Sequence, residues 1–186
     1  MKAFGSAGLV VVMAMAACAR APERTAAATG PVAAAAPAVT DAEIAAIVVA
    51  ANAVDAEMGE LASARATDAA VREFGRTMTR DHRAVNEQAG ALVTKLGVTP
   101  AENDVSRKLR ADATVFRAEL EKKSGADFDR AYMAHEVAYQ RAVIAAVDDV
   151  LIPSARNAEL KQTLVAVRPA LVAHLEHAEQ LERKLK

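Results

Sequence analysis

The stretch that decides the fold begins at residue 40 and reads TDAEIAAIVVAANAVDAEMGEL (40–61). Its apolar residues recur at intervals of three and four, which is the spacing of one face of an α-helix. Thr40 followed by Glu43 forms the S/T-x-x-E pattern of a capping box, in which the two side chains bind the first free amide groups of a helix. These features predict a helix over residues 41–65.

The same apolar spacing continues along the chain and predicts four further helices. Asp68 is placed to cap the second helix, and Gly97 to end it. The Ser124-Gly125 pair separates the third helix from the fourth, which is expected to end before Pro153. The four apolar stripes lie within residues 71–96, 105–120, 128–150 and 160–181.

No window of the sequence shows the alternation of a β-strand, so the predicted fold class is all-α. Helices of this length joined by short turns pack as antiparallel neighbours. We therefore predict an antiparallel up-and-down bundle of four to five helices that forms one domain over residues 41–186.

The residues before this domain have the three parts of a secretory signal. Lys2 is followed by an uncharged apolar run over residues 3–17, and the small residues Ala16 and Ala17 precede Cys18. Fifteen residues are too few for a comfortable membrane span. We predict a signal peptide over residues 1–17, cleaved before Cys18, and an exported mature protein.

Cys18 is the only cysteine of the chain, which excludes an internal disulfide. The stretch 15–18 (MAAC) resembles the lipobox of bacterial lipoproteins, with Met15 where Leu is usual. We predict that Cys18 carries a lipid that anchors the protein to a membrane on its periplasmic side. Ala19 favours the outer membrane. Ordinary signal-peptidase cleavage, which would give a soluble secreted or periplasmic protein, stays open as the alternative.

Residues 18–40 consist mainly of Ala, Pro, Thr and Gly, and no large apolar residue recurs among them. Such a segment buries too little surface to offset its ordering entropy, so we predict a disordered tether between the anchor and the bundle. The mature chain has 22 basic and 24 acidic residues, a formal net charge of −2. This balance argues against a nucleic-acid partner and leaves the membrane as the predicted one.

Ionisable side chains on the apolar stripes are the candidates for chemistry. They are Asp55, Asp81, His82, His135 and His174. Core-facing polar groups must be paired, neutral or bound to something, so two interpretations stay open. One is a hydrogen-bonded network that fixes the register of the helices. The other is a site for a transition metal (Fe, Mn, Zn or Cu), with His135 as a possible additional ligand.

No Gly-rich phosphate loop, nucleophile elbow or free catalytic thiol accompanies these residues. The favoured function is therefore non-catalytic: a binding protein or a component of the envelope or of a stress response. A ferritin-like metal-binding protein, with possible oxidative chemistry, is the alternative.

Four segments in order resemble the family called DUF4142: VDAEMGELA (54–62), VREFGRTMTRDH (71–82), FDRAYM (128–133) and PALVAHL (169–175). The resemblance covers about residues 41–183. It implies a ferritin-like helical bundle in exported bacterial proteins, often labelled outer-membrane proteins or lipoproteins, with no settled activity. The Asp-His pair and the late His that such proteins share correspond to Asp81, His82 and His174.

The chain departs from the family pattern in one place. The family usually has a Val-x-Asp-His stretch where this sequence has VAYQ (137–140), so Gln140 stands in place of a His. If that His is a metal ligand in the relatives, this chain has lost it. His135, about one helical turn earlier, is the open candidate to replace it.

Overall fold

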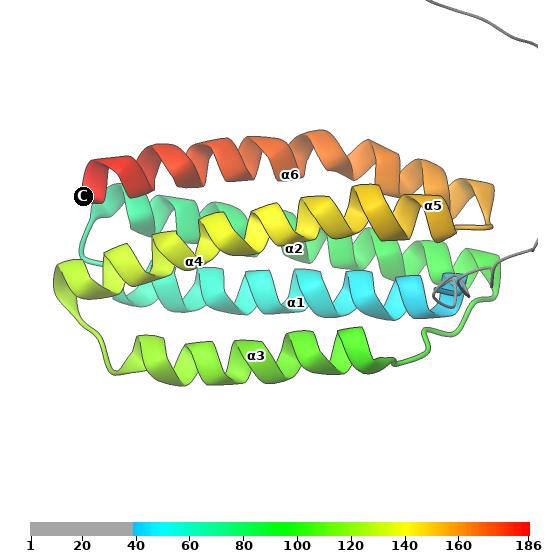
Figure 1. The fold of residues 1–186 in the computed structure, drawn as a ribbon, viewed down its shortest axis with the longest axis horizontal. Helices are drawn as coiled ribbons and strands as arrows, with labels where there is room; N and C mark the ends of the chain where they lie inside the picture. The colour runs from blue at the N-terminus through cyan, green and yellow to red at the C-terminus, as the bar shows by residue number, and fades with distance from the viewer. Residues whose placement is uncertain (1–38) are drawn as a thin grey trace, which may run out of the picture. The chain divides into compact units, whose positions relative to one another are not determined.

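The computed structural model describes residues 39–186, and these residues form an all-helical bundle (Figure 1). The elements are α1 (Asp41–Arg65), α2 (Ala69–Leu96), α3 (Asp104–Glu121), α4 (Gly125–Ala146), the π-helical turn η1 (Val147–Leu151), α5 (Ile152–Ser154) and α6 (Ala158–Leu185). No strand occurs within the described residues. The predicted fold class is confirmed, whereas the predicted signal peptide, Cys18 and nearly all of the tether lie outside the described residues.

The five long helices run up and down, each opposite in direction to the one before it (Figure 1). Helix α1 packs most closely on α2, and α4 packs most closely on α6. Helix α3 covers the outer side of α1. The bundle thus consists of two tight helix pairs that face each other, with α3 added to the first pair. None of these helices is both long and apolar enough to span a membrane.

The helix ends follow the predicted capping signals. The Thr40 hydroxyl accepts from the Glu43 amide at 3.3 Å, and the Glu43 carboxylate accepts from the Thr40 amide at 2.9 Å, which completes the capping box. Asp68 accepts from the first amides of α2. Gly97 ends α2 with a φ of 63°, a left-handed conformation that favours glycine.

The helix around Pro153 differs from the predicted one. Instead of stopping before Pro153, the chain leaves α4 through η1 and continues helically to Ser154. The Ile152 amide donates to the Val147 carbonyl, five residues back. Proline lacks an amide donor and its ring crowds the preceding turn, so a widened π turn is one way to continue through it.

The contact between α1 and α2 depends on two glycines. A Cβ atom on Gly59 would lie 2.6 Å from the Gly75 carbonyl oxygen, and a Cβ atom on Gly75 would lie 2.7 Å from that of Gly59. The fully buried Ala50 and Ala62 lie on the same helix as Gly59. Small side chains let the two backbones approach closely, which explains the alanine content of α1.

The apolar core has two parts, separated along the bundle by a layer of polar side chains. The first part contains most of the large side chains: Met58, Phe74, Met78, Leu120, Phe128, Tyr132 and Met133 are its largest members. The second part is aliphatic, with Ile44, Ile47, Val147, Leu151, Leu160, Leu164 and Leu171 among its members. On α1, α2, α4 and α6 alike, polar residues occupy the positions between the two parts.

We expect the Gly59→Ala variant to lower the free energy of unfolding by about 1–3 kcal/mol, because the added methyl group meets the backbone of α2. Gly90→Ala is the matched control on α2. Its Cβ atom would meet nothing within 4 Å, so we expect a gain of about 0.5–1 kcal/mol from helix propensity. Urea unfolding followed by circular dichroism measures both. A Gly59→Ala protein as stable as wild type would contradict the close contact.

Candidate functional site

Four polar side chains in the layer between the two core parts are almost completely buried. They are Asp55 on α1, His82 on α2, and Glu136 and Gln140 on α4, and none is more than 4 % exposed. Polar groups removed from water must find partners or lose their charge. The hydrogen bonds of this layer therefore decide its protonation.

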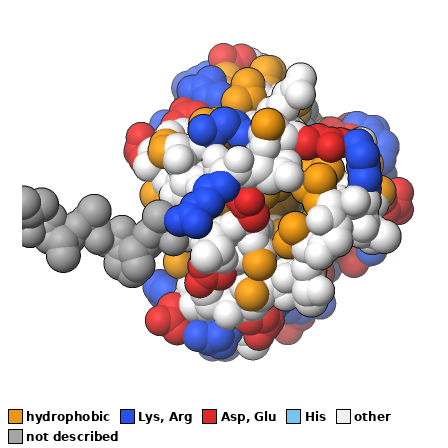
Figure 2. Space-filling model, turned by 90° about the vertical axis from the view of Figure 1, so that its right-hand side faces the viewer, with side chains coloured by type: hydrophobic (Ala, Val, Ile, Leu, Met, Phe, Trp, Pro, Cys, Tyr) orange, Lys and Arg blue, Asp and Glu red, His pale blue; other side chains and the backbone are white. Residues whose placement is uncertain are grey.

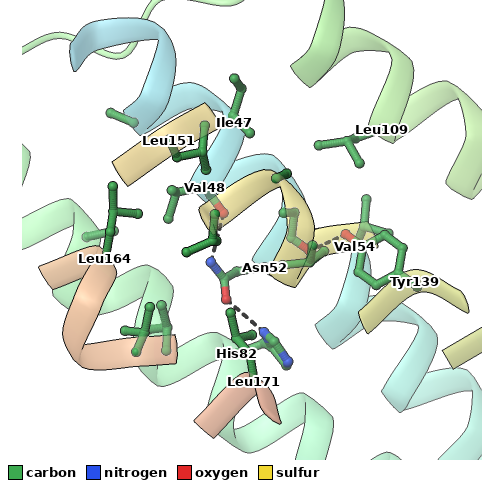
Figure 3. A pocket seen from close by; sticks show the side chains of 18 of the residues that line it. Ile47, Val48, Asn52, Val54, His82, Leu109, Tyr139, Leu151, Leu164 and Leu171 are labelled. Atoms are coloured by element: carbon green, nitrogen blue, oxygen red, sulfur yellow. Dashed lines mark hydrogen bonds between the residues drawn. The ribbon is translucent and has the colours of Figure 1, made fainter. Parts of the chain in front are cut away.

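Asn52 fixes the tautomer of His82. The Asn52 side-chain nitrogen donates to the Val48 carbonyl at 2.8 Å, so its side-chain oxygen is the atom that faces His82 Nδ1 at 2.7 Å (Figure 3). Because that oxygen only accepts, Nδ1 must hold a proton and donate it. In a neutral imidazole, Nε2 then has a lone pair and no proton.

On the other side of the ring, His82 Nε2 lies 3.1 Å from Asp55 Oδ2. The same carboxyl oxygen accepts from the Gln140 amide at 2.7 Å. His82 Nε2 makes no hydrogen bond within the described residues, so its contact with Asp55 Oδ2 is a close approach of two buried groups. Burial raises the pKa of Asp55 to about 7, and burial, with a smaller contribution from His174, lowers the pKa of His82 to about 4. Below about pH 7 the proton therefore stays on Asp55, and the pair is neutral.

Glu136 adds a second carboxyl group to the layer. Burial raises its pKa well above the usual value, and the Asp55 charge adds to this effect. The nearby Tyr132 hydroxyl has a raised pKa for the same two reasons, burial first and then the charges of Glu136 and Asp55. Among the described residues, neither Asp55 nor Glu136 pairs with Lys or Arg. Burial thus favours the uncharged form of both acids, and Asp55 is uncharged below about pH 7.

A second His–carboxylate pair lies beside the first. His174 Nε2 on α6 lies 3.1 Å from Asp81 Oδ2 on α2, and the His174 and His82 ring centroids are 5.3 Å apart. Burial acts to raise the pKa of Asp81, but hydrogen bonds from Arg80 and His174 outweigh it and lower the pKa. Asp81 is therefore ionised, and His174 donates to it from Nε2.

The predicted metal ligands are only partly brought together. Asp55, Asp81, His82 and His174 form two adjacent pairs, whereas His135 stacks on the Phe116 ring with centroids 3.6 Å apart. Within residues 39–186 no three His, Cys, Asp or Glu side chains have an arrangement that could hold a metal ion. Asn52 hydrogen-bonds His82 Nδ1 and Asp81 hydrogen-bonds His174 Nε2, so the arrangement agrees with the network interpretation. The metal site stays a prediction.

Two members of the layer were not among the sequence-based candidates. Glu136 and Asn52 belong to it as fully as Asp55 and His82. The sequence spacing could have indicated Glu136. It lies four residues after Tyr132 and four before Gln140, so all three share one face of the helix. Asn52 lies three residues before Asp55 on α1 and could have been found in the same way.

Next to the polar layer, in the aliphatic part of the core, lies a cavity of about 530 Å³. It lies between the α1–α2 and α4–α6 pairs, and α3 also contributes to its wall. Asn52, His82, His174 and Tyr139 form its polar end, where the Tyr139 hydroxyl donates to the Ala51 carbonyl at 2.9 Å. Labelled aliphatic residues around it in Figure 3 are Ile47, Val48, Val54, Leu109, Leu151, Leu164 and Leu171.

Small side chains account for the space. Ala89 on α2 and Ala142 and Ala146 on α4 are among the residues that line the cavity. Protein interiors are normally packed with few voids larger than a water molecule. At the end of the bundle that holds the cavity, hydrophobic side chains are visible among charged ones (Figure 2). Sequence periodicity did not predict this cavity.

Comparison with known proteins gives one match. The family model described as "Domain of unknown function (DUF4142)" matches residues 26–181. No curated protein and no solved structure matches the chain.

The neutral Asp55–His82 pair predicts opposite pH effects in two variants. The pKa of Asp55 is raised from 3.8 to about 7, so its contribution to stability is lost as the pH rises through that range. The pKa of His82 is lowered from 6.5 to about 4, so its contribution is lost as the pH falls. In the wild type the two effects cancel between about pH 4.5 and 6.5.

Relative to wild type, we expect His82→Gln to lose about 2 kcal/mol of stability as the pH rises from 4.5 to 6.5, because only the Asp55 effect remains. We expect Asp55→Asn to lose a similar amount as the pH falls over the same range. Urea unfolding at several pH values measures both. Two variants with the pH profile of the wild type would rule out the neutral pair.

Proposed function

The chain belongs to the DUF4142 family, and we propose that its bundle is a non-catalytic binding domain that encloses an elongated apolar molecule between its helices. The supporting observation is the cavity of about 530 Å³, whose lining is mostly aliphatic. Small-molecule sites typically measure about 300–1,000 Å³ and are mainly apolar, with a few polar groups. The cavity has this size and composition.

The accessibility and the lining of the cavity support the same proposal. The exposed Val105 is one of its lining residues, so the cavity reaches the surface and a ligand can enter it. An apolar wall offers water few hydrogen bonds, so an apolar ligand is the better occupant.

The extent of the lining favours an elongated ligand. On α2 the lining residues run from Asp81 to Val93, a distance of about 18 Å at the rise of an α-helix. On α6 they run from Leu160 to His174, about 21 Å. A hydrocarbon chain placed along the bundle between the two helix pairs would contact most of this wall.

The proposal includes the location of the protein. The predicted signal peptide and the lipobox-like sequence around Cys18 support export and attachment to a membrane, with the outer membrane favoured. A tethered domain on the periplasmic side would have apolar envelope molecules within reach. A role in the envelope or in a stress response follows from such a location.

The transition-metal alternative has one supporting observation, the 5.3 Å separation of the His82 and His174 rings beside two carboxyl groups. It is the weaker candidate because no three His, Cys, Asp or Glu side chains within residues 39–186 are arranged to hold a metal ion. Asn52 and Asp81 also each hydrogen-bond one of the two rings.

We expect the apolar fluorescent probe N-phenyl-1-naphthylamine to bind the wild type saturably. Ala89→Trp, which places a large side chain in the cavity, should weaken this binding about tenfold or more. The matched control is Ala84→Trp, an exposed position on the same helix that does not line the cavity. Circular dichroism verifies the fold of both variants. Equal probe affinities in both would contradict binding in the cavity.

For the anchor, we expect the mature wild type, expressed with its own leader, to begin with a diacylglycerol-modified Cys18 and to partition into detergent. Cys18→Ala should lack the modification and stay in the aqueous phase. Mass spectrometry of the N-terminal peptide and detergent phase separation measure these outcomes. An unmodified Cys18, or cleavage at another residue, would exclude the lipid anchor.

A further inference from the structure

A second hollow, of about 340 Å³, lies on the surface between α2 and α6. Its lining is Gln88, Ala91, Leu92, Lys95, Glu159 and Thr163. Gln88, Leu92 and Thr163 also line the apolar cavity, so the two spaces adjoin. We call this second space the α2–α6 hollow. It is more open and more polar than the cavity that it borders.

The polar groups of the α2–α6 hollow differ in availability. Lys95 and Glu159 form an ion pair at 2.6 Å that joins the two helices. The Thr163 hydroxyl donates to the Glu159 carbonyl at 2.9 Å, and its oxygen can still accept a hydrogen bond from a ligand. Gln88 makes no hydrogen bond to another described residue and offers both a donor and an acceptor. The amide and the hydroxyl can therefore bind a ligand without breaking an existing contact.

The charged groups of both spaces are already paired. In the cavity the charged lining residues are Asp81, which pairs with Arg80 and His174, and Asp112, which pairs with Lys108. No Lys or Arg lines the cavity. A carboxylate inside it would meet only like charges, and a charged group in the hollow would have to compete with the Lys95–Glu159 pair. An uncharged polar group avoids both costs.

We infer that the ligand is a single-chain amphiphile with an uncharged, hydrogen-bonding head group, such as a monoacylglycerol or a long-chain alcohol. Its hydrocarbon chain lies in the cavity, and its head group lies in the α2–α6 hollow against Gln88 and Thr163. This inference rests on the proposed apolar binding function and adds the orientation and the chemical class of the ligand.

Three ligands with the same hydrocarbon tail test the inference: glycerol monododecanoate, dodecanoate and dodecyltrimethylammonium. Each is used below the concentration at which it forms micelles, and displacement of N-phenyl-1-naphthylamine reports its binding. We expect the uncharged ligand to bind the wild type about tenfold or more tightly than either charged one. Dodecanoate binding as tightly as the glyceride would overturn the inference.

Variants separate the head-group contacts from the cavity. Gln88→Leu combined with Thr163→Val should weaken glyceride binding about three- to tenfold relative to probe binding, because only the glyceride loses hydrogen bonds. Gln162→Leu, an exposed position on α6 outside both spaces, is the control and should change neither affinity. Glu159→Gln removes the ion-pair partner of Lys95. We therefore expect it to reduce the difference in affinity between the glyceride and dodecanoate.

The outcomes distinguish this inference from the proposed function. If the probe binds but the double variant leaves glyceride affinity unchanged, the head-group assignment is wrong and apolar binding stands. If neither the probe nor any of the three ligands binds, both fail.

Discussion

The structure depends on the burial of two ionisable side chains in contact, Asp55 on α1 and His82 on α2. Ionised, these two groups would have to be removed from water as charges, at a cost of several kcal/mol each. The neutral form avoids this cost. Gln140 donates a hydrogen bond to Asp55, Asn52 accepts one from His82, and the Val48 carbonyl accepts one from Asn52. Because the pair and these groups together come from α1, α2 and α4, their contacts set the register of three helices at one height along the bundle.

The polar layer at that height divides the core into two parts that differ in side-chain size and packing. Towards the α1–α2 turn, Phe74, Phe128 and Tyr132 fill the interior, and Gly59 and Gly75 bring the helices close together. On the other side the walls are aliphatic and alanine-rich, and the helix pairs stay apart around the cavity. The tightly packed part supplies most of the large buried side chains, and the proposed ligand site lies in the other part.

The helices and most of their ends were predictable from the sequence because they depend on local chemistry, and the end near Pro153 is the exception. Thr40 with Glu43, Asp68 and Gly97 each act within one helical turn, and all four do what the pattern indicates. Periodicity also indicated that Asp55, His82 and His174 face the interior. It could not indicate the height of each residue in the assembled bundle, so it left open whether they meet. The cavity was not predictable, because it results from how far apart two helix pairs settle, and an alanine is equally compatible with close packing and with empty space.

Gln140 bears on the choice between a metal centre and a binding cavity. In this bundle it stands at the centre of the polar layer, where its amide donates to Asp55 and none of its surface is exposed. A histidine at this position, as the resemblance to the family suggests for its relatives, would bring a second imidazole to Asp55 and make a cation at this site easier to hold. An amide instead supplies a fixed hydrogen-bond donor and no ligand that a transition metal prefers. The polar layer of this chain therefore favours a neutral hydrogen-bonded arrangement over a bound cation, and the space suited to a ligand is the apolar cavity beside it.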